Sequence, residues 1–474
     1  MIGAFLMGPV MRLFCAFFLM GVLMDHVWFC VSGPGGWVWA NESVAGYSPS
    51  GAGDMKEGAP KLFSVCPLMG PKRTAVVIEG RNFGSDPDMV EVRFNGTRAE
   101  VQSVSGARIT TEVPARAFTG VLTVKVGGIW LLGPEFEYEV SEVKVSTFAG
   151  RPDHGGFDGS FRNGIGKEAG FDRPRDLARD SKGNLFVADF GNHAIRKIGP
   201  NGRVSTFAGN GVAGDADGLG VRARFKFPQG LTIDGADNIY VADTGNHAIK
   251  RIDPSGRVAT IAGRAQGYRD GKGPDARFDY PSGIAMGGQN DLYVSETRSH
   301  TIRRISLDDF EVTTYAGSKW RHSGTANGNL KTARFRFPSG LAMDDNGNLL
   351  VADTYNDMVR AIDLSAGTVR TLAGGDRNSD VKKTKPPMFY CPRGVAVDKQ
   401  GIVSMTDTKN QCIRRIDLEG RIVTIAGVPN SKGYKDGQGS EAKFSNPYGI
   451  LNYDQGEIYV ADTDNHAIRK ITID

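Results

Sequence analysis

The sequence predicts an all-β protein in which a six-bladed β-propeller of four-stranded blades follows a small β-sandwich. Three observations support this fold class. One short run of residues recurs six times, each recurrence carries four strand-like segments, and the strands are unevenly distributed between the two ends of the repeat region. A regular period of this kind indicates a repeat architecture and not one large irregular domain.

The recurring run ends the chain as VADTDNHAIRKI and has close copies at Val187–Ile198 and Val241–Ile252. One acidic residue marks each copy, at intervals of 53 to 57 residues: Asp189, Asp243, Glu296, Asp353, Asp407 and Asp462. A residue present in every copy is expected to be structural. We therefore expect each carboxylate to hold the turn after it by accepting a backbone N–H two residues on, and we look for a binding site where the copies differ.

One repeat contains four apolar segments that alternate with polar residues. In the copy that begins at Pro228 they are Gly230–Asp234, Asn238–Asp243, Ala248–Ile252 and Arg257–Gly263. Period-two alternation bounded by Gly, Asp, Asn and Pro is typical of β-strands joined by tight turns. Four such antiparallel strands make one propeller blade. The loop between blades carries one Phe per copy, which we expect to pack between neighbouring blades: Phe171, Phe225, Phe278, Phe335, Phe389 and Phe444.

The two ends of the repeat region complement one another. The last copy has three strands, and an isolated fourth strand, Val145–Gly150, precedes the first complete copy. We expect this strand to complete the blade that begins at Pro447, because such pairing protects the exposed sheet edges. The sequence thus predicts a propeller over residues 141–474, closed by an N-terminal strand.

The first 140 residues divide into three parts. Leu13–Met24 is an apolar run of twelve residues after Arg12, which is typical of a signal-peptide core and short for a membrane span. We expect residues 1–40 to be a signal peptide cleaved after Ala40, with a lipoprotein signal at Cys30 as the alternative. Residues 41–60 have the composition of a linker, and residues 61–140 carry strand-like runs that suit a small immunoglobulin-like sandwich.

These features predict an extracytoplasmic protein that is secreted, periplasmic or on the cell surface. A membrane would be contacted only through the signal segment or a lipid anchor. The net charge of +4 on 474 residues is too small and scattered to favour nucleic acid as a partner. Three of the five cysteines lie beyond the predicted signal, which does not suit a disulfide framework.

The residue after the Pro that ends each interblade loop varies from copy to copy. If the innermost strand of each blade begins there, the six side chains surround one mouth of the central channel, and polar, variable residues on a repeated frame are typical of a binding site. These candidate ligand-binding residues are Arg175, Gln229, Ser282, Ser339, Arg393 and Tyr448.

No catalytic or metal-binding constellation is visible in the sequence. Nucleophile and base spacings, a phosphate loop and clustered carboxylates are not found, so we predict no cofactor and no catalytic residue. Four histidines occupy equivalent turns, and turns on different blades lie too far apart to share a metal ion, so we assign them a structural role. They are His193, His247, His300 and His466.

The repeated run resembles the NHL repeat, and the resemblance covers residues 143–474. Residues 61–140 resemble an IPT/TIG domain through Glu79–Gly84, Val92–Asn95 and Val113-Pro114. The first resemblance implies a β-propeller and the second an immunoglobulin-like fold. NHL propellers are mostly binding platforms and in a minority lyases or hydrolases, so the resemblance leaves enzymatic activity open.

Three functions follow as alternatives. The first is a non-enzymatic scaffold that binds a glycan, a peptide or a protein at the loop face and channel mouth of the propeller. The second is a propeller lyase or hydrolase with a metal in the channel, for which Asp176 is the one carboxylate directly after the variable positions. The third is a structural assembly module of the cell surface.

Overall fold

A computed structural model describes residues 27–33, 36–42 and 58–473, apart from 115–116, 118, 139–141, 152–158, 289, 376–388, 400, 417–421 and 454–455. Its regular structure is strand with single 3-10 turns, so the all-β prediction is confirmed for this part of the chain. The 3-10 turns are η1 (Pro87–Met89), η2 (Gly166–Glu168), η3 (Gly220–Arg222), η4 (Thr244–Asn246), η5 (Gly273–Asp275), η6 (Thr354–Asn356), η8 (Thr408–Asn410) and η9 (Thr463–Asn465). Within the same residues no helix is long and apolar enough to span a membrane.

An antiparallel pair of strands precedes the sandwich, β1 (Val27–Gly33) with β2 (Gly36–Glu42). Cys30, the alternative lipidation site, is in β1, and the predicted cleavage site is in β2. The predicted signal core, Leu13–Met24, lies outside the described residues, as does most of the predicted linker.

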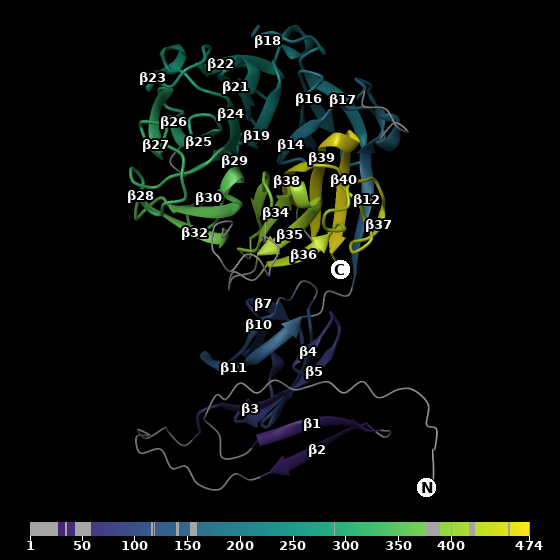
Figure 1. Cartoon of the computed structure of the whole chain (residues 1–474). Helices are drawn as coiled ribbons and strands as arrows, with labels where there is room; N and C mark the ends of the chain where they lie inside the picture. Colours follow the sequence, from purple (N-terminus) through teal and green to yellow (C-terminus); the bar gives the residue numbers. More distant parts are fainter. Residues whose placement is uncertain are drawn as a thin grey trace, which may run out of the picture.

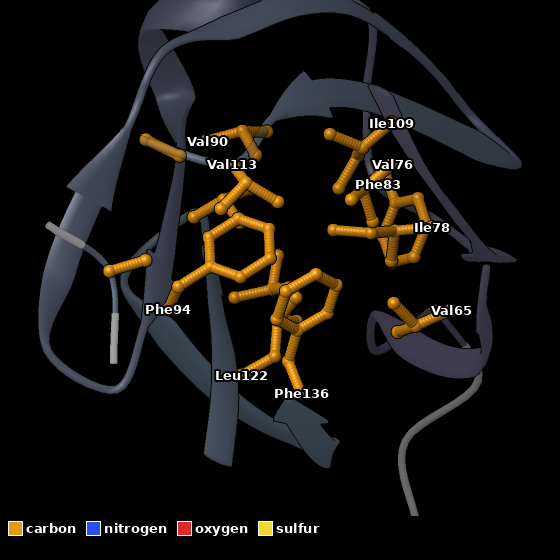
Figure 2. Packing of buried hydrophobic residues seen from close by; sticks show 14 of the residues in the cluster. Val65, Val76, Ile78, Phe83, Val90, Phe94, Ile109, Val113, Leu122 and Phe136 are labelled. Atoms are coloured by element: carbon orange, nitrogen blue, oxygen red, sulfur yellow. The ribbon is translucent and has the colours of Figure 1, made fainter. Parts of the chain in front are cut away.

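Residues 61–138 form two facing sheets, the arrangement expected of an immunoglobulin-like sandwich. One sheet has the order β3-β5-β9-β8: β3 (Lys61–Cys66), β5 (Ala75–Arg81), β9 (Arg108–Glu112) and β8 (Val101–Ser105). The other has the order β4-β11-β10-β6-β7: β4 (Met69–Gly70), β11 (Ile129–Tyr138), β10 (Gly120–Val126), β6 (Val90–Phe94) and β7 (Thr97–Ala99). Their inward side chains make one apolar core, in which the rings of Phe94 and Phe136 meet edge to face at 4.8 Å (Figure 2).

The strands from β12 onward form six sheets arranged as a ring (Figure 1), and the innermost strands of all six line one central cavity. The innermost strand of each sheet lies beside the innermost strand of the next, and β38 lies beside β14, so the ring is continuous. We call these innermost strands the hub strands: β14 (Pro174–Arg179), β19 (Pro228–Ile233), β24 (Pro281–Met286), β29 (Pro338–Met343), β33 (Val395–Val397) and β38 (Pro447–Tyr453).

Each sheet continues outward in the predicted order. The second strands are β15 (Leu185–Asp189), β20 (Ile239–Asp243), β25 (Asp291–Glu296), β30 (Asn348–Asp353), β34 (Val403–Asp407) and β39 (Glu457–Asp462). The third strands are β16 (Ala194–Ile198), β21 (Ala248–Ile252), β26 (Thr301–Ser306), β31 (Met358–Asp363), β35 (Cys412–Ile416) and β40 (Ala467–Ile473). The fourth strands are β17 (Arg203–Ala208), β22 (Arg257–Gly263), β27 (Glu311–Ala316), β32 (Thr368–Gly374), β36 (Ile422–Ala426) and β12 (Val143–Gly150).

The ring is closed by the strand that the sequence predicts. β12 pairs antiparallel with β40, so a strand from before the first complete sheet finishes the last one. Val145 is 1% exposed and packs with Phe444, Ile450 and Ile471. The predicted closure is therefore confirmed.

Most sheets carry a fifth strand of two residues that the sequence did not predict. The interblade loop adds this strand to the outer edge of the blade it leads into, before it turns inward to the hub. These strands are β13 (Gly164–Ile165), β18 (Gly218–Leu219), β23 (Gly271–Lys272), β28 (Gly328–Asn329) and β37 (Gly437–Gln438). Two residues are too few for any periodic pattern to show.

Candidate functional site at the hub of the ring

Five hub strands begin with Pro and a variable residue, and in the fifth blade the same two residues, Pro392 and Arg393, come just before β33. The next residue is Gly in five of the six blades. A Cβ on the Gly would overlap the backbone carbonyl oxygen of the variable residue on the next hub strand, so only Gly permits the close approach of neighbouring strands. These glycines are Gly230, Gly283, Gly340, Gly394 and Gly449. The contact fixes the variable residues in a tight circle.

The structure brings the six variable side chains to one mouth of the channel in different ways. Gln229, Ser282, Arg393 and Tyr448 line the central cavity, whose volume is about 340 Å³. Ser339 is fully buried and bonds to the backbone carbonyl of Arg393, 2.9 Å away. Arg175 is stacked beside the cavity and is not part of its lining.

Tyr448 is the centre of this group. Its hydroxyl accepts a 2.9 Å hydrogen bond from Arg393 and donates a 3.0 Å bond to the amide oxygen of Gln229, which also accepts from Ser282 at 3.1 Å. The guanidinium carbons of Arg175 and Arg393 lie 4.4 Å and 4.8 Å from its ring centroid. Burial raises the pKa of the phenol, but the charges of Arg393 and Arg175 outweigh burial and the net direction is downward.

The first blade departs from the repeat at two further hub positions. Asp176 stands where the other five hub strands have Gly, and its carboxylate accepts a 2.9 Å bond from the backbone N–H of Leu231 on the next blade. Phe190 stands where the other blades have Thr, and its ring packs against Phe227 and the guanidinium of Arg175. These two departures from the repeat are therefore both on one blade. A comparison of the six copies in the sequence could have revealed them.

Asp176 titrates far from its ordinary range. Burial raises the pKa of this carboxyl to about 7, although backbone N–H groups of Leu231 and Leu177 bond to it and pull the pKa down. A carboxyl of this kind changes charge near neutral pH, where an ordinary Asp is fully ionised.

We expect Asp176→Asn to stabilise the protein at pH 8 and to have little effect near pH 4. The folded pKa of Asp176 is raised above its unfolded value, so the wild type loses stability as pH rises from about 4 to about 7, whereas Asn does not titrate. Since the side chain is only partly buried, the gain at pH 8 should be about 2 kcal/mol. Urea unfolding at both pH values measures it, and an equal effect at pH 4 and pH 8 would contradict the assignment.

The repeated acids do not accept the backbone N–H two residues on, contrary to the expectation. The 3-10 turns after Asp243, Asp353, Asp407 and Asp462 have no side-chain cap. Instead, one carboxylate oxygen in every blade accepts a backbone N–H 17 residues earlier, at 2.7 to 2.8 Å. The acid therefore ties the end of the second strand to the segment that leads into the hub strand.

The other carboxylate oxygen binds a basic residue seven positions later in five of the blades. These side chains are on the third strand of the same blade, and the pairs are Asp189 with Arg196, Glu296 with Arg303, Asp353 with Arg360, Asp407 with Arg414 and Asp462 with Arg469. The arginines of four pairs are fully buried, and each lies over the interblade Phe of its blade.

Glu296 keeps this arrangement with a longer side chain. All five other blades have Asn three residues after the acid, and its amide donates to the carboxylate at 2.7 to 2.9 Å, as in Asn192 to Asp189. The third blade has the shorter Ser299 there, and the hydroxyl of Thr301 donates to Glu296 instead. The side chain of Glu296 is one methylene longer than Asp, and the shorter Ser299 in place of Asn leaves room for it.

The second blade has Lys250 where the others have Arg. Its ammonium group reaches Asp217 at 2.8 Å, the side chain of Thr260 and a backbone carbonyl, but no bond to Asp243 forms. A cavity of about 140 Å³ lies beside Lys250 and Thr260. Burial raises the pKa of Asp243 to about 7, compared with about 6 for Asp189 and Asp353, which have an Arg partner.

We expect Lys250→Arg to stabilise the protein by about 1 kcal/mol, because the guanidinium can fill this cavity and reach Asp243 as Arg196 reaches Asp189. Thermal unfolding measures the change. Lys182→Arg, at an exposed turn, is the control and should leave the melting temperature unchanged. An equal shift in both variants would mean that the gain does not come from the buried site.

The histidines connect neighbouring blades. Each lies in the left-handed conformation after its turn, and its Nδ1 accepts a backbone N–H from the segment that enters the next hub strand, at 3.1 to 3.3 Å: His193 from Phe227, His247 from Tyr280, His300 from Phe337 and His466 from Arg173. Burial lowers the pKa of His193, His247 and His300, which favours the neutral form that can accept this bond. Across the described residues, no group of three His, Cys, Asp or Glu side chains is arranged to hold a metal ion.

Comparison with known proteins identifies both parts of the chain. The IPT/TIG domain family model matches residues 60–138, and the NHL repeat model matches residues 171–198, 225–252 and 335–358. These matches agree with the sandwich and with three of the blades.

Curated relatives match about three fifths of the chain. The chain is 31% identical over 322 residues to the Arabidopsis thaliana protein SUPPRESSOR OF QUENCHING 1, chloroplastic, which covers 63% of this chain and 30% of that protein. It is 29% identical over 326 residues to the human NHL repeat-containing protein 2, covering 61% of this chain and 45% of that protein. The chain therefore spans less than half the length of these relatives.

Two solved bacterial structures resemble the chain in fold. A structural genomics protein of unknown function from Bacteroides thetaiotaomicron aligns with a TM-score of 0.59 at 20% identity, over 89% of this chain and 99% of its own. An auxiliary nutrient binding protein from Bacteroides ovatus aligns with a TM-score of 0.52 at 19% identity, over 88% of this chain and 99% of its own. The chain is thus an NHL-repeat protein in which the repeats follow an IPT/TIG domain.

Proposed function

We propose that this protein is a non-enzymatic, extracytoplasmic binding protein whose propeller takes a ligand at the hub mouth. The observation that carries the proposal is the convergence of Gln229, Ser282, Arg393 and Tyr448 on one cavity of about 340 Å³. The repeat leaves these positions free to vary while the Gly contacts hold their backbones in place. A concave site with a few polar groups on a rigid frame is what ligand binding requires.

The likeness to the Bacteroides ovatus auxiliary nutrient binding protein is compatible with this function at the level of fold. An extracytoplasmic location is supported by the apolar run Leu13–Met24 after Arg12. Mass spectrometry of the protein recovered from its native cells tests the location, because a cleaved signal removes the residues up to about Ala40. A chain that retains its N-terminus in the cytoplasm would refute it.

Binding is tested with the full-length protein and a panel of small saccharides, organic acids and short peptides, measured by isothermal titration calorimetry. We expect at least one compound to bind the wild type and to bind Gln229→Ala at least tenfold more weakly. Gln102→Ala, on an exposed strand of the sandwich, is the matched control and should bind normally. A ligand whose affinity is the same in all three proteins would place the site elsewhere.

An enzymatic channel is the second candidate, favoured by the near-neutral pKa of Asp176 at the cavity wall. A carboxyl with a pKa of about 7 is suited to general acid or base chemistry. Metal analysis of the purified protein, together with turnover assays on any ligand found, separates the two functions. Stoichiometric metal, or turnover that Asp176→Asn abolishes, would replace the binding proposal with an enzymatic one.

A further inference from the structure

Two arginines meet at the hub mouth without an acidic partner. The guanidinium of Arg175 lies between the rings of Phe190 and Tyr448, with its carbon 4.5 Å and 4.4 Å from their centroids. Its Nε is buried and has no hydrogen-bond partner among the described residues. Arg393 lies 4.8 Å from the same Tyr448 ring and donates to the phenol oxygen.

The acids nearest this pair are engaged elsewhere. Asp176 accepts from backbone N–H groups, with no bond to either arginine. Asp464 bonds to Lys432 and to the side chain of Asn446. Asp172 bonds to Arg173 at 3.0 Å. No salt bridge to Arg175 or Arg393 forms within the part of the chain that the structure describes.

This sets the half-buried hub pair apart from the fully buried arginines of the blades. Arg196, Arg303, Arg360 and Arg469 are fully buried, and each has a fully buried carboxylate within 3.0 Å. The fold therefore neutralises buried arginines throughout the blades but leaves two positive charges together at the mouth. Positive charges partly removed from water are costly unless an opposite charge approaches them.

We propose that the hub mouth binds the oxyanion of a small organic ligand, a carboxylate or a phosphate group, at Arg393, with Arg175 beside the cavity adding a second positive charge. The planar guanidinium presents several N–H donors that match the two or three oxygens of such a group. The inference rests on the proposed function and specifies the ligand class at the same site.

The cavity limits the rest of the ligand. Besides Tyr448 and Arg393 it is lined by apolar side chains of the hub strands, among them Ile233, Met286 and Met343, and by the polar side chains of Asp176, Arg179 and Asn452. A volume of about 340 Å³ suits a small molecule and excludes a folded partner from the channel itself. The ligand class is thus a compact organic acid or phosphate ester whose anionic end remains at the mouth.

The test uses calorimetry on the full-length protein with inorganic phosphate, acetate, succinate and uncharged glucose, all at one ionic strength set with sodium chloride. We expect phosphate, or one of the two carboxylates, to bind the wild type. Arg175→Gln and Arg393→Gln should each weaken that binding at least tenfold. Arg257→Gln removes an exposed arginine at the start of β22 and should have no effect. Whichever anion responds identifies phosphate or carboxylate as the preferred group.

The remaining outcomes are distinguishable. Equal anion binding in Arg175→Gln, Arg393→Gln and wild type would overturn the inference, since the anion would then sit elsewhere. Binding of glucose that Gln229→Ala weakens, with no binding of anions, would overturn the inference and leave the proposed function standing. No binding by any probe or by the wider ligand panel would overturn both.

A stability measurement guards against misfolded variants. Because Arg175 is half-buried, and its Nε has no hydrogen-bond partner among the described residues, Arg175→Gln should melt no lower than the wild type when no anion is added. Addition of the effective anion should then raise the melting temperature of the wild type and not that of the variant. A large loss of stability in Arg175→Gln without anion would show that the arginine is structural and would contradict the inference.

Discussion

Val145→Asp is expected to open the ring. Val145 is 1% exposed, lies opposite Ile471 in the register of β12 with β40, and packs with apolar residues of the fifth and sixth blades. A carboxylate placed there loses apolar contact and is buried without a partner, so we expect a loss of about 3–5 kcal/mol in the free energy of unfolding. Urea unfolding followed by circular dichroism measures it.

The neighbouring residue supplies a matched control. Lys144 is on the same strand with its side chain exposed, so Lys144→Asp introduces the same group without burying it. We expect it to change the stability by less than about 0.5 kcal/mol. Limited proteolysis should cut Val145→Asp, and not Lys144→Asp, near the opened edge of the last blade. If Val145→Asp melts as cooperatively and at the same temperature as wild type, β12 does not hold the ring together.

The architecture could be predicted from the sequence because the same local pattern is repeated. One copy of a four-strand pattern is weak support, but six copies in one order fix the period, and the isolated strand at Val145–Gly150 then has one natural place. The two-residue outer strands could not be predicted in this way. They depend on where the interblade loop meets the edge of the next sheet, which is a long-range contact.

The role of the repeated acids was predicted only in part. Their structural nature followed from their presence in every copy, but the local Asx interpretation was wrong because the true partners are 17 residues before and seven residues after the acid. Arg224, the residue before the interblade Phe225, is another basic residue in the sequence that could pair with an acid. In the structure Arg224 donates to the exposed Asn210, while the acid of the preceding blade binds Arg196. The i and i+7 pairing is visible in the sequence once the second and third strands are treated as a hairpin.

The candidate site could also be predicted from the sequence only in part. The position after the loop Pro could be identified from its variation alone, and the structure places these residues around one mouth. Which of them face the cavity depends on packing that the repeat does not encode, such as the stacking of Arg175 on Phe190. Asp176 and Phe190 are detectable as the departures of one blade from Gly and Thr, because a break in a repeated rule often marks a functional position.

Arg303→Met is expected to cost about 3–5 kcal/mol at pH 8, because it leaves Glu296 buried without its counter-ion. Arg303 is fully buried and also donates to the backbone carbonyls of Arg277 and Arg269 and to Asp270. Met retains much of the side-chain volume over Phe278, so the loss reports mainly the missing charge and hydrogen bonds. Urea unfolding at pH 8 and at pH 5 measures it.

The pH dependence separates charge from packing. Burial already raises the pKa of Glu296, and the charge of Arg303 opposes that rise, so the variant should raise the pKa further. A folded pKa above the unfolded value means that stability is lost as pH rises through it, so the deficit should be smaller at pH 5 than at pH 8. In Glu296→Gln with Arg303→Met the charge is absent, and the deficit should be smaller than in Arg303→Met and independent of pH. If Arg303→Met loses the same stability at both pH values, the loss comes from packing and not from the ion pair.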